Sequence, residues 1–285
     1  MQNHVENVIK VIEFIEDHLS ENLDLDIVAK AVHYSKYHLH RMFVNEVGLT
    51  IHDYVQRRQL TEAAKFLVFS HKSIIEIALI AGYESQQAFT AIFKEMYKKT
   101  PNQYREDEEF YPLQLRYTLN KNPIKFAEPS SWKQRIAFAV QDDIPQWIHL
   151  VHLVIDGFPY LDEEKYMIQL QEYIDHKRAF ILKDAETAIG IMAFNEKTGS
   201  IDFLGVHPQY RRQGITRAFL EKVLEELVDP DTNVTVTTFR EGDKADTGYR
   251  NTFKGLGFTE AELLVEFDYP TQRFILQKGS LENID

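Results

Sequence analysis

One segment in the C-terminal half has the residue types and spacing of a phosphate site. An apolar stretch ending at Val206 leads through His207-Pro208 into a basic loop, Arg211 to Gly214, and a helical pattern follows at once. The first N–H groups of a helix have no partner inside it, and the helix dipole adds partial positive charge there. Glycine lets the backbone come close to a ligand. The segment therefore predicts a pyrophosphate site.

The N-terminal half contains a repeat of another kind, with two copies offset by about 50 residues. In each copy a short helical pattern and a turn lead to a serine, Ser35 or Ser85, which we expect to cap the next helix. Apolar residues follow each serine at the fourth, seventh and eighth positions, which is one face of a helix. They are Leu39, Met42 and Phe43 in the first copy and Phe89, Ile92 and Phe93 in the second. Two matched copies predict two helix-turn-helix units.

The elements around these units are also predicted to be helical. Residues 50–67 indicate one long joining helix, residues 8–15 an opening helix, and Thr100-Pro101 the start of a closing helix. Residues 5–107 closely resemble the DNA-binding domain of AraC/XylS-type transcription regulators. The residues that carry the resemblance are Ala29, Ser35, Leu39, Arg41, Phe43, Gly48, Tyr54, Arg57, Leu60, Ala63, Leu67, Ile74, Ile77, Ala78, Gly82, Tyr83, Ser85, Phe89, Phe93, Lys94, Pro101, Tyr104 and Arg105.

This resemblance implies that the second helix of each unit enters a major groove of double-stranded DNA. Arg41 suits a guanine or a phosphate, and Gln86 or Gln87 suits an adenine. The alternative for each residue alone is a solvated helix face. The candidate DNA-binding residues are Lys36, Tyr37, His38, His40, Arg41, Ser85, Gln86, Gln87, Thr90 and Lys94. No metal site is predicted, because side chains two positions apart, such as those of His38 and His40, diverge on a helix.

The composition fits a soluble protein of two domains. The chain has 285 residues, no cysteine and a formal net charge of −12. The absence of cysteine excludes disulfides and thiolate metal sites. Residues 1–107 carry 12 Lys and Arg against 15 Asp and Glu, so DNA contact requires a local basic face. No apolar run approaches the roughly 18 residues of a membrane span, and the first residues lack a secretory pattern, so we expect a cytoplasmic protein without membrane contact.

The rest of the chain predicts a connector over residues 108–131 and an α+β domain over 132–280. Phe110–Leu119 alternates as a strand or a packed connector would. The predicted strands are 135–140, 179–183, 188–195, 201–206, 233–239, 258–269 and 273–277, and the predicted helices 143–155, 163–174, 212–227 and 247–255. This order resembles the GNAT N-acetyltransferases, which have a mixed, mostly antiparallel central sheet. Arg211 to Thr216 matches their Gln/Arg-x-x-Gly-x-Gly/Ala pattern, except that Thr216 stands where Gly or Ala is expected.

The GNAT resemblance implies that acetyl-CoA binds here and donates an acetyl group to an amine. Leu204 and Val206 would lie beside the pantetheine and acetyl groups. The pyrophosphate would be held by Arg211, Arg212, Gln213, Gly214, Ile215 and Thr216. Asp202 matches a position where many members carry the base, although it can also be an exposed strand-edge residue. The acid tyrosine is replaced by Phe253, and Tyr249, one helical turn earlier, could substitute or simply pack.

Together these features predict a multidomain chain with an all-α domain of two helix-turn-helix units and an α+β GNAT acyl-CoA N-acyltransferase fold. The function predicted first is a sequence-specific transcription regulator that also acetylates an unidentified amine. Two alternatives remain. In one, the GNAT domain only senses acetyl-CoA or a metabolite and modulates DNA binding; in the other, the helical domain merely recruits an acetyltransferase.

Overall fold

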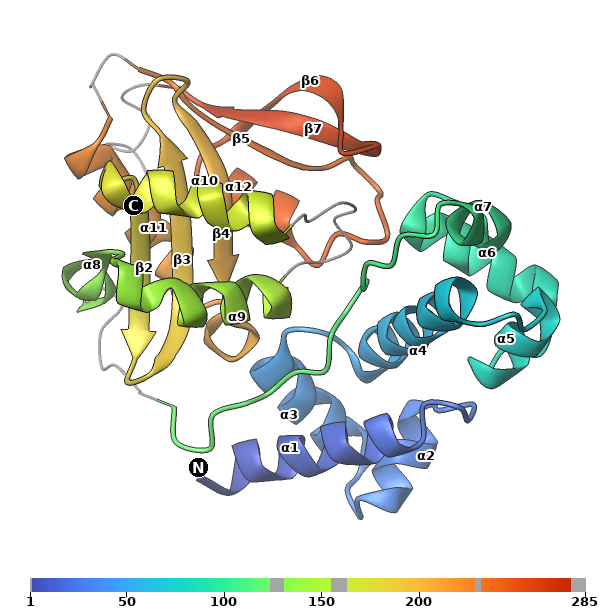
Figure 1. The fold of residues 1–285 in the computed structure, drawn as a ribbon. Coiled ribbons are helices and arrows are strands. Elements are labelled where there is room, and N and C mark those ends of the chain that lie inside the picture. Colours follow the sequence, from blue (N-terminus) through green and yellow to red (C-terminus); the bar gives the residue numbers. More distant parts are fainter. Residues whose placement is uncertain (1, 124–130, 155–162, 229–231, 278–285) are drawn as a thin grey trace. The chain divides into compact units, whose positions relative to one another are not determined.

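The computed structural model describes residues 2–123, 131–154, 163–228 and 232–277, which divide into two units (Figure 1). The first unit is helical and extends to Pro123, and the described residues from 131 onward form the second. Within these ranges, no helix has both the length and the apolar composition needed to cross a membrane.

The first unit contains the two predicted helix-turn-helix pairs. Its helices are α1 (Gln2–Asp17), α2 (Leu25–Ala31), α3 (Lys36–Val47), α4 (Ile51–Phe69), α5 (Ile74–Ile80), α6 (Gln86–Tyr97) and α7 (Pro101–Glu106). α2 and α3 form one pair, α5 and α6 the other, and α4 is the long joining helix. Ser35 and Ser85 cap α3 and α6 by accepting N–H groups three residues on, at 3.4 and 3.2 Å, which confirms both predicted caps.

The core of this unit uses the predicted apolar positions. Leu39, Phe43, Phe89 and Phe93 are each 0% exposed. α3 and α6 also end alike, at Gly48 and Lys98, which lie fifty positions apart. Both residues have left-handed backbones, with φ of 81° and 63°. Glycine adopts this conformation without strain from a Cβ atom, and a lysine does so at some cost.

The predicted connector begins on this helical unit. The described part, residues 108–123, contains no strand, so the alternation in Phe110–Leu119 belongs to a packed segment. Its buried residues are Tyr111, Leu113, Gln114, Tyr117 and Leu119. Residues 124–130, also assigned to the connector, lie outside the described residues.

The second unit is an α+β fold around one sheet, as predicted. Its elements are α8 (Ser131–Arg135), β1 (Ala137–Phe138), the 3₁₀ turn η1 (Gln141–Asp143), α9 (Ile144–Val154), α10 (Glu163–Asp175), β2 (Ala179–Asp184), β3 (Thr187–Asn195), β4 (Ser200–Val206), the 3₁₀ turn η2 (Pro208–Tyr210), α11 (Ile215–Glu226), β5 (Val234–Phe239), α12 (Tyr249–Gly255), β6 (Thr259–Glu266) and β7 (Tyr269–Leu276). The strand order is β1-β2-β3-β4-β5-β7-β6. Only β4 and β5 are parallel, so the sheet is mixed and mostly antiparallel.

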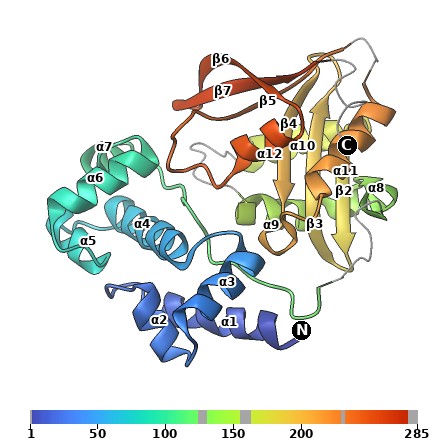
Figure 2. The same ribbon diagram turned by 180° about the vertical axis from the view of Figure 1, so that it is seen from behind.

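Helices cover both faces of this sheet. α9 and α10 lie on one face (Figure 1), and α11 and α12 lie on the other (Figure 2). A Cβ atom on Gly190 of β3 would come within 2.5 Å of the Phe219 ring on α11, so this glycine permits the close approach of that helix. The main apolar core lies under α11 and includes Phe180, Phe194 and Phe219.

Several predicted boundaries were wrong. The strand predicted from Arg135 is only Ala137–Phe138, because residues 131–135 form α8. The last two strands meet at residues 267–268 rather than 270–272. Phe267 and Asp268 have φ of 52° and 56° and form a two-residue turn. This turn lacks the usual glycine or asparagine, so the sequence did not indicate it.

Candidate functional site

The predicted DNA-binding residues lie on the outer faces of α3 and α6. Most of them are exposed, and His38, Ser85 and Thr90 are half-buried. The exposed residues are Lys36, Tyr37, His40 and Arg41 on α3 and Gln86, Gln87 and Lys94 on α6. The arrangement therefore leaves one basic and aromatic face on α3 and one amide-rich face on α6.

Local contacts distinguish the residues on α3. The Arg41 guanidinium lies 5.7 Å from the centroid of the Tyr37 ring, and Tyr37 is 77% exposed. Lys36 forms an ion pair with Asp26 of α2. The His38 ring lies 5.5 Å from that of Tyr34, which favours packing for this residue. Among the described residues, no group of three or more His, Asp or Glu side chains could hold a metal ion.

In the second unit, the sheet opens between β4 and β5. The two strands pair only at Ser200 with Thr235 and at Ile201 with Val236. Beyond these pairs, residues 203–206 pair with β3 alone, and their edge toward β5 has no ladder partner among the described residues. Backbone N–H and C=O groups without a ladder partner need other partners, and the Val206 carbonyl has one in the Arg211 side chain. The opening therefore suits an extended ligand that carries amide groups, beside the predicted Leu204 and Val206.

The predicted phosphate loop follows directly from β4. Arg212 and Gly214 have left-handed backbones, with φ of 62° and 78°, so α11 begins at Ile215 and not at Arg212 as predicted. Gly214 is the N-cap and supplies no side-chain hydrogen bond, whereas each helix from α2 to α7 has a side-chain cap. Gln213 and Gly214 are exposed and Thr216 is half-buried. The loop and the first turn of α11 thus present backbone amides, as an anion site requires.

Buried contacts hold this loop in place. The Trp132 indole N–H of α8 donates to the Gln213 carbonyl at 3.0 Å. The hydroxyl of Tyr210, which is 0% exposed, donates to the Asp184 carboxylate at 2.6 Å. These anchors come from elements far apart in the sequence, so no local pattern of residues indicated them.

Arg211 lies where β4 ends. Its Nε donates to the Val206 carbonyl at 3.4 Å, and its guanidinium lies 5.9 Å from the centroid of the Tyr249 ring. The predicted pyrophosphate residue and the predicted acid therefore meet at the carboxyl end of β4. Tyr249 also approaches the ring of Phe239, at the end of β5, to 6.4 Å.

The predicted base, Asp202, occupies a β-bulge at the other end of the opening. Ala193 pairs with Phe203 and Phe194 with Ile201, so Asp202 is the extra residue. Its two carboxylate oxygens accept hydrogen bonds from the hydroxyls of Tyr173 and Ser200. Burial, with the hydrogen bond to Asp202 as second cause, raises the pKa of Tyr173 to about 12, so this hydroxyl stays protonated at neutral pH.

Asp202 and Tyr249 are not brought together. β4 rises about 13 Å from residue 202 to residue 206, and Tyr249 lies beyond the far end of this stretch. Phe253, predicted to stand at the family's acid position, is 3% exposed and packs on Phe258 in the core. Ser200 could have been noticed from its position near Asp202, but Tyr173 is 29 residues away and no spacing pointed to it.

Comparisons with known proteins match each unit separately. A family described as a helix-turn-helix domain matches residues 28–107, and the acetyltransferase (GNAT) family matches residues 147–258. The HTH-type transcriptional regulator YbfP of Bacillus subtilis, itself uncharacterized, is 42% identical over 96 residues, which are 34% of this chain and 32% of that protein. PqrA of Proteus vulgaris, described as a probable transcription factor, is 41% identical over 36% of this chain and 86% of its own length. The regulatory protein SoxS of Salmonella typhimurium is 37% identical over 36% of this chain and 96% of its own length.

Proposed function

We propose that this chain, which belongs to the AraC-type helix-turn-helix regulators and carries a GNAT acetyltransferase domain, reads double-stranded DNA through α3 and α6 and transfers an acetyl group from acetyl-CoA to an amine. The observation that carries the acyl-CoA proposal is the separation of β4 from β5, followed directly by a helix that starts without a side-chain cap. The opening offers partners for the amides of pantetheine, and the helix start offers N–H groups for a pyrophosphate.

The residues of this site have separate roles in the proposal. The backbone of residues 213–216 holds the pyrophosphate, Arg211 and Arg212 add positive charge, and the β4 edge at Leu204 and Val206 orients the pantetheine and acetyl groups. Acetyl-CoA supplies the thioester. Asp202 accepts a proton from the amine, directly or through one water, as the new C–N bond forms and the C–S bond breaks. Tyr249 supplies a proton to the departing thiolate.

A second function has specific support. Phe253 lies in the core at the position of the family's acid, and both Asp202 oxygens already accept hydrogen bonds. These features favour a GNAT domain that binds acyl-CoA without turnover and modulates DNA binding. The two functions share the ligand site and differ in whether Asp202 and Tyr249 act on an acceptor.

Acetyl-CoA should raise the melting temperature of the full chain. A ligand present at 100 times its Kd and bound only to the folded state stabilises by about 2.7 kcal/mol, which is a shift of a few degrees for a unit of this size. Adenosine, which lacks the pyrophosphate, is the matched control and should give a much smaller shift. Equal shifts with both ligands, or no shift at millimolar acetyl-CoA, would oppose the proposed site.

Arg41→Ala should weaken binding to a duplex that the wild-type chain selects from a random library. If Arg41 pairs with a guanine, the loss is about 1–3 kcal/mol and the preference at one base position relaxes. Lys94→Ala, on the exposed face of α6, should instead weaken binding about equally for all sequences and reduce the salt dependence. Fluorescence anisotropy at several salt concentrations separates the two patterns. Affinity of the Arg41 variant equal to that of wild type on every duplex would refute the assignment.

A further inference from the structure

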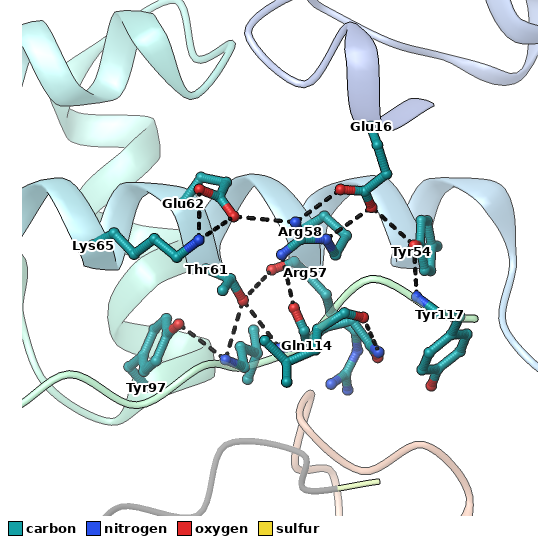
Figure 3. Close-up of polar contacts among 12 residues, drawn as sticks. Glu16, Tyr54, Arg57, Arg58, Thr61, Glu62, Lys65, Tyr97, Gln114 and Tyr117 are labelled. Atoms are coloured by element: carbon teal, nitrogen blue, oxygen red, sulfur yellow. Dashed lines mark hydrogen bonds and ion pairs between the residues drawn. The ribbon is translucent and has the colours of Figure 1, made fainter. Parts of the chain in front are cut away.

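Residues Tyr111–Tyr117, here called the strap, run alongside α4 in an extended form that is neither helix nor strand (Figure 3). The strap is not a loose linker, since Leu113 and Gln114 are 0% and 1% exposed. A buried extended segment must satisfy its backbone N–H and C=O groups without a ladder. The strap does so with side chains of the DNA-binding unit.

One anchor is a single hydroxyl on α4. Thr61, which is 0% exposed, accepts the N–H groups of Leu113 and Gln114 at 3.1 and 3.0 Å. Its own hydroxyl donates to the Arg57 carbonyl at 3.0 Å. A valine here would keep the shape and remove the acceptor of the Gln114 N–H, whereas the Leu113 N–H would keep a second acceptor, the Tyr97 hydroxyl.

A second anchor reaches α6, the helix that is proposed to read DNA in the second copy of the helix-turn-helix repeat. Tyr97 is the last residue of α6, and its hydroxyl accepts the N–H of Leu113 at 3.2 Å. Its ring stacks on that of Phe93 in the core, with centroids 4.5 Å apart. The strap is therefore bonded directly to the end of α6.

Two relays connect the strap to α1 (Figure 3). Arg58 of α4 donates to both oxygens of Glu16 at 2.8 Å and to the Gln114 carbonyl at 3.0 Å. The Tyr54 hydroxyl donates to Glu16 at 2.8 Å and accepts the N–H of Tyr117 at 3.3 Å. The Arg58 and Glu16 side chains are only 7% and 8% exposed, so this network is largely shielded from water. α1 packs on α3, so the strap reaches the other DNA-reading helix through this network.

We propose that the docked strap fixes the spacing of α3 and α6 and so sets the affinity of the helical unit for DNA. Two helices that read successive groove segments, about 34 Å apart along the duplex, must keep their spacing to bind together. Without the docked strap, Arg58 loses the Gln114 carbonyl as an acceptor, and Thr61 loses the two N–H groups that donate to it. α4 is then held less firmly against α1 and α6. This positioning role rests on the DNA binding proposed above.

The test uses the full chain with Thr61→Val, and with Thr61→Ser as the matched control that keeps the hydroxyl. Hydrogen exchange at the Gln114 amide should be about tenfold faster or more in Thr61→Val, because its acceptor is gone, and exchange at Leu113, which keeps the Tyr97 hydroxyl, should change less. The DNA probes are the duplex selected by the wild type and a derivative in which one groove segment is randomised. Thr61→Val should lose about tenfold in affinity on the complete site and much less on the half-randomised site. Thr61→Ser should match the wild type on both.

Other outcomes overturn the proposal. An equal loss on both duplexes would mean that the strap only stabilises the fold, and no loss despite faster exchange would mean that it is only a tether. Where Thr61→Val does not fold, Tyr97→Phe removes one acceptor for Leu113 and is held to the same comparison. A wild-type chain that selects no duplex would refute the proposed DNA binding itself, which is a distinguishable result.

Discussion

Asp202→Asn should lower acetyl transfer by about 10²–10⁴-fold, the usual contribution of a general base, while the Kd for acetyl-CoA changes little. Asparagine keeps the shape of the side chain and cannot take a proton from an ammonium group. The base acts on the acceptor, so the loss should appear in turnover and not in binding of the acyl donor. Release of CoA thiol with a panel of polyamines and aminoglycosides measures turnover, and calorimetry measures binding.

Two variants sharpen this result. Asp175→Asn, at the exposed end of α10, removes a carboxylate from the same unit and should leave turnover unchanged. Tyr173→Phe removes one hydrogen bond to Asp202 and keeps the ring, so it should shift the pH profile of turnover without abolishing it. Turnover that is untouched in Asp202→Asn would remove this residue as the base. If the wild-type protein binds acetyl-CoA and then changes its affinity for DNA, but acetylates no amine, the GNAT domain is a sensor and not an enzyme.

The sequence predicted those features that depend on neighbours along the chain. Ser35 and Ser85 cap helices by bonds three residues away, and Leu39 and Phe43 lie one helical turn apart, so local spacing was enough to place them. The succession of strands along the second unit was also accessible, because short apolar runs such as those of β2 and β3 mark each strand by itself.

The remaining features depend on contacts between distant parts of the chain. The bulge at Asp202 exists only in the pairing of β4 with β3, and Tyr173 reaches it from α10. The alternation in Phe110–Leu119 looked like a strand because alternate residues are buried, yet its N–H groups bond to side chains such as Thr61. No periodicity along the chain reports where a hydroxyl from another helix will lie.

Gly214→Asp and Gly214→Asn form a pair that isolates charge at the proposed pyrophosphate loop. Gly214 has φ of 78°, and Asp and Asn are the side chains that best tolerate this conformation, so both variants strain the backbone alike. The two side chains have nearly the same shape, and only aspartate adds a negative charge beside the first N–H groups of α11. A like charge facing a pyrophosphate is strongly unfavourable in a site built from backbone amides.

Calorimetric titration of acetyl-CoA into the full chain and this pair of variants is the measurement that tests acyl-CoA binding most directly. We expect wild type to bind, Gly214→Asn to bind within a few-fold of wild type, and Gly214→Asp to lose about 100-fold or more, a difference of about 2.7 kcal/mol. Circular dichroism should show that both variants keep the wild-type fold. Equal affinity of the Asp and Asn variants for acetyl-CoA would contradict a pyrophosphate at the start of α11.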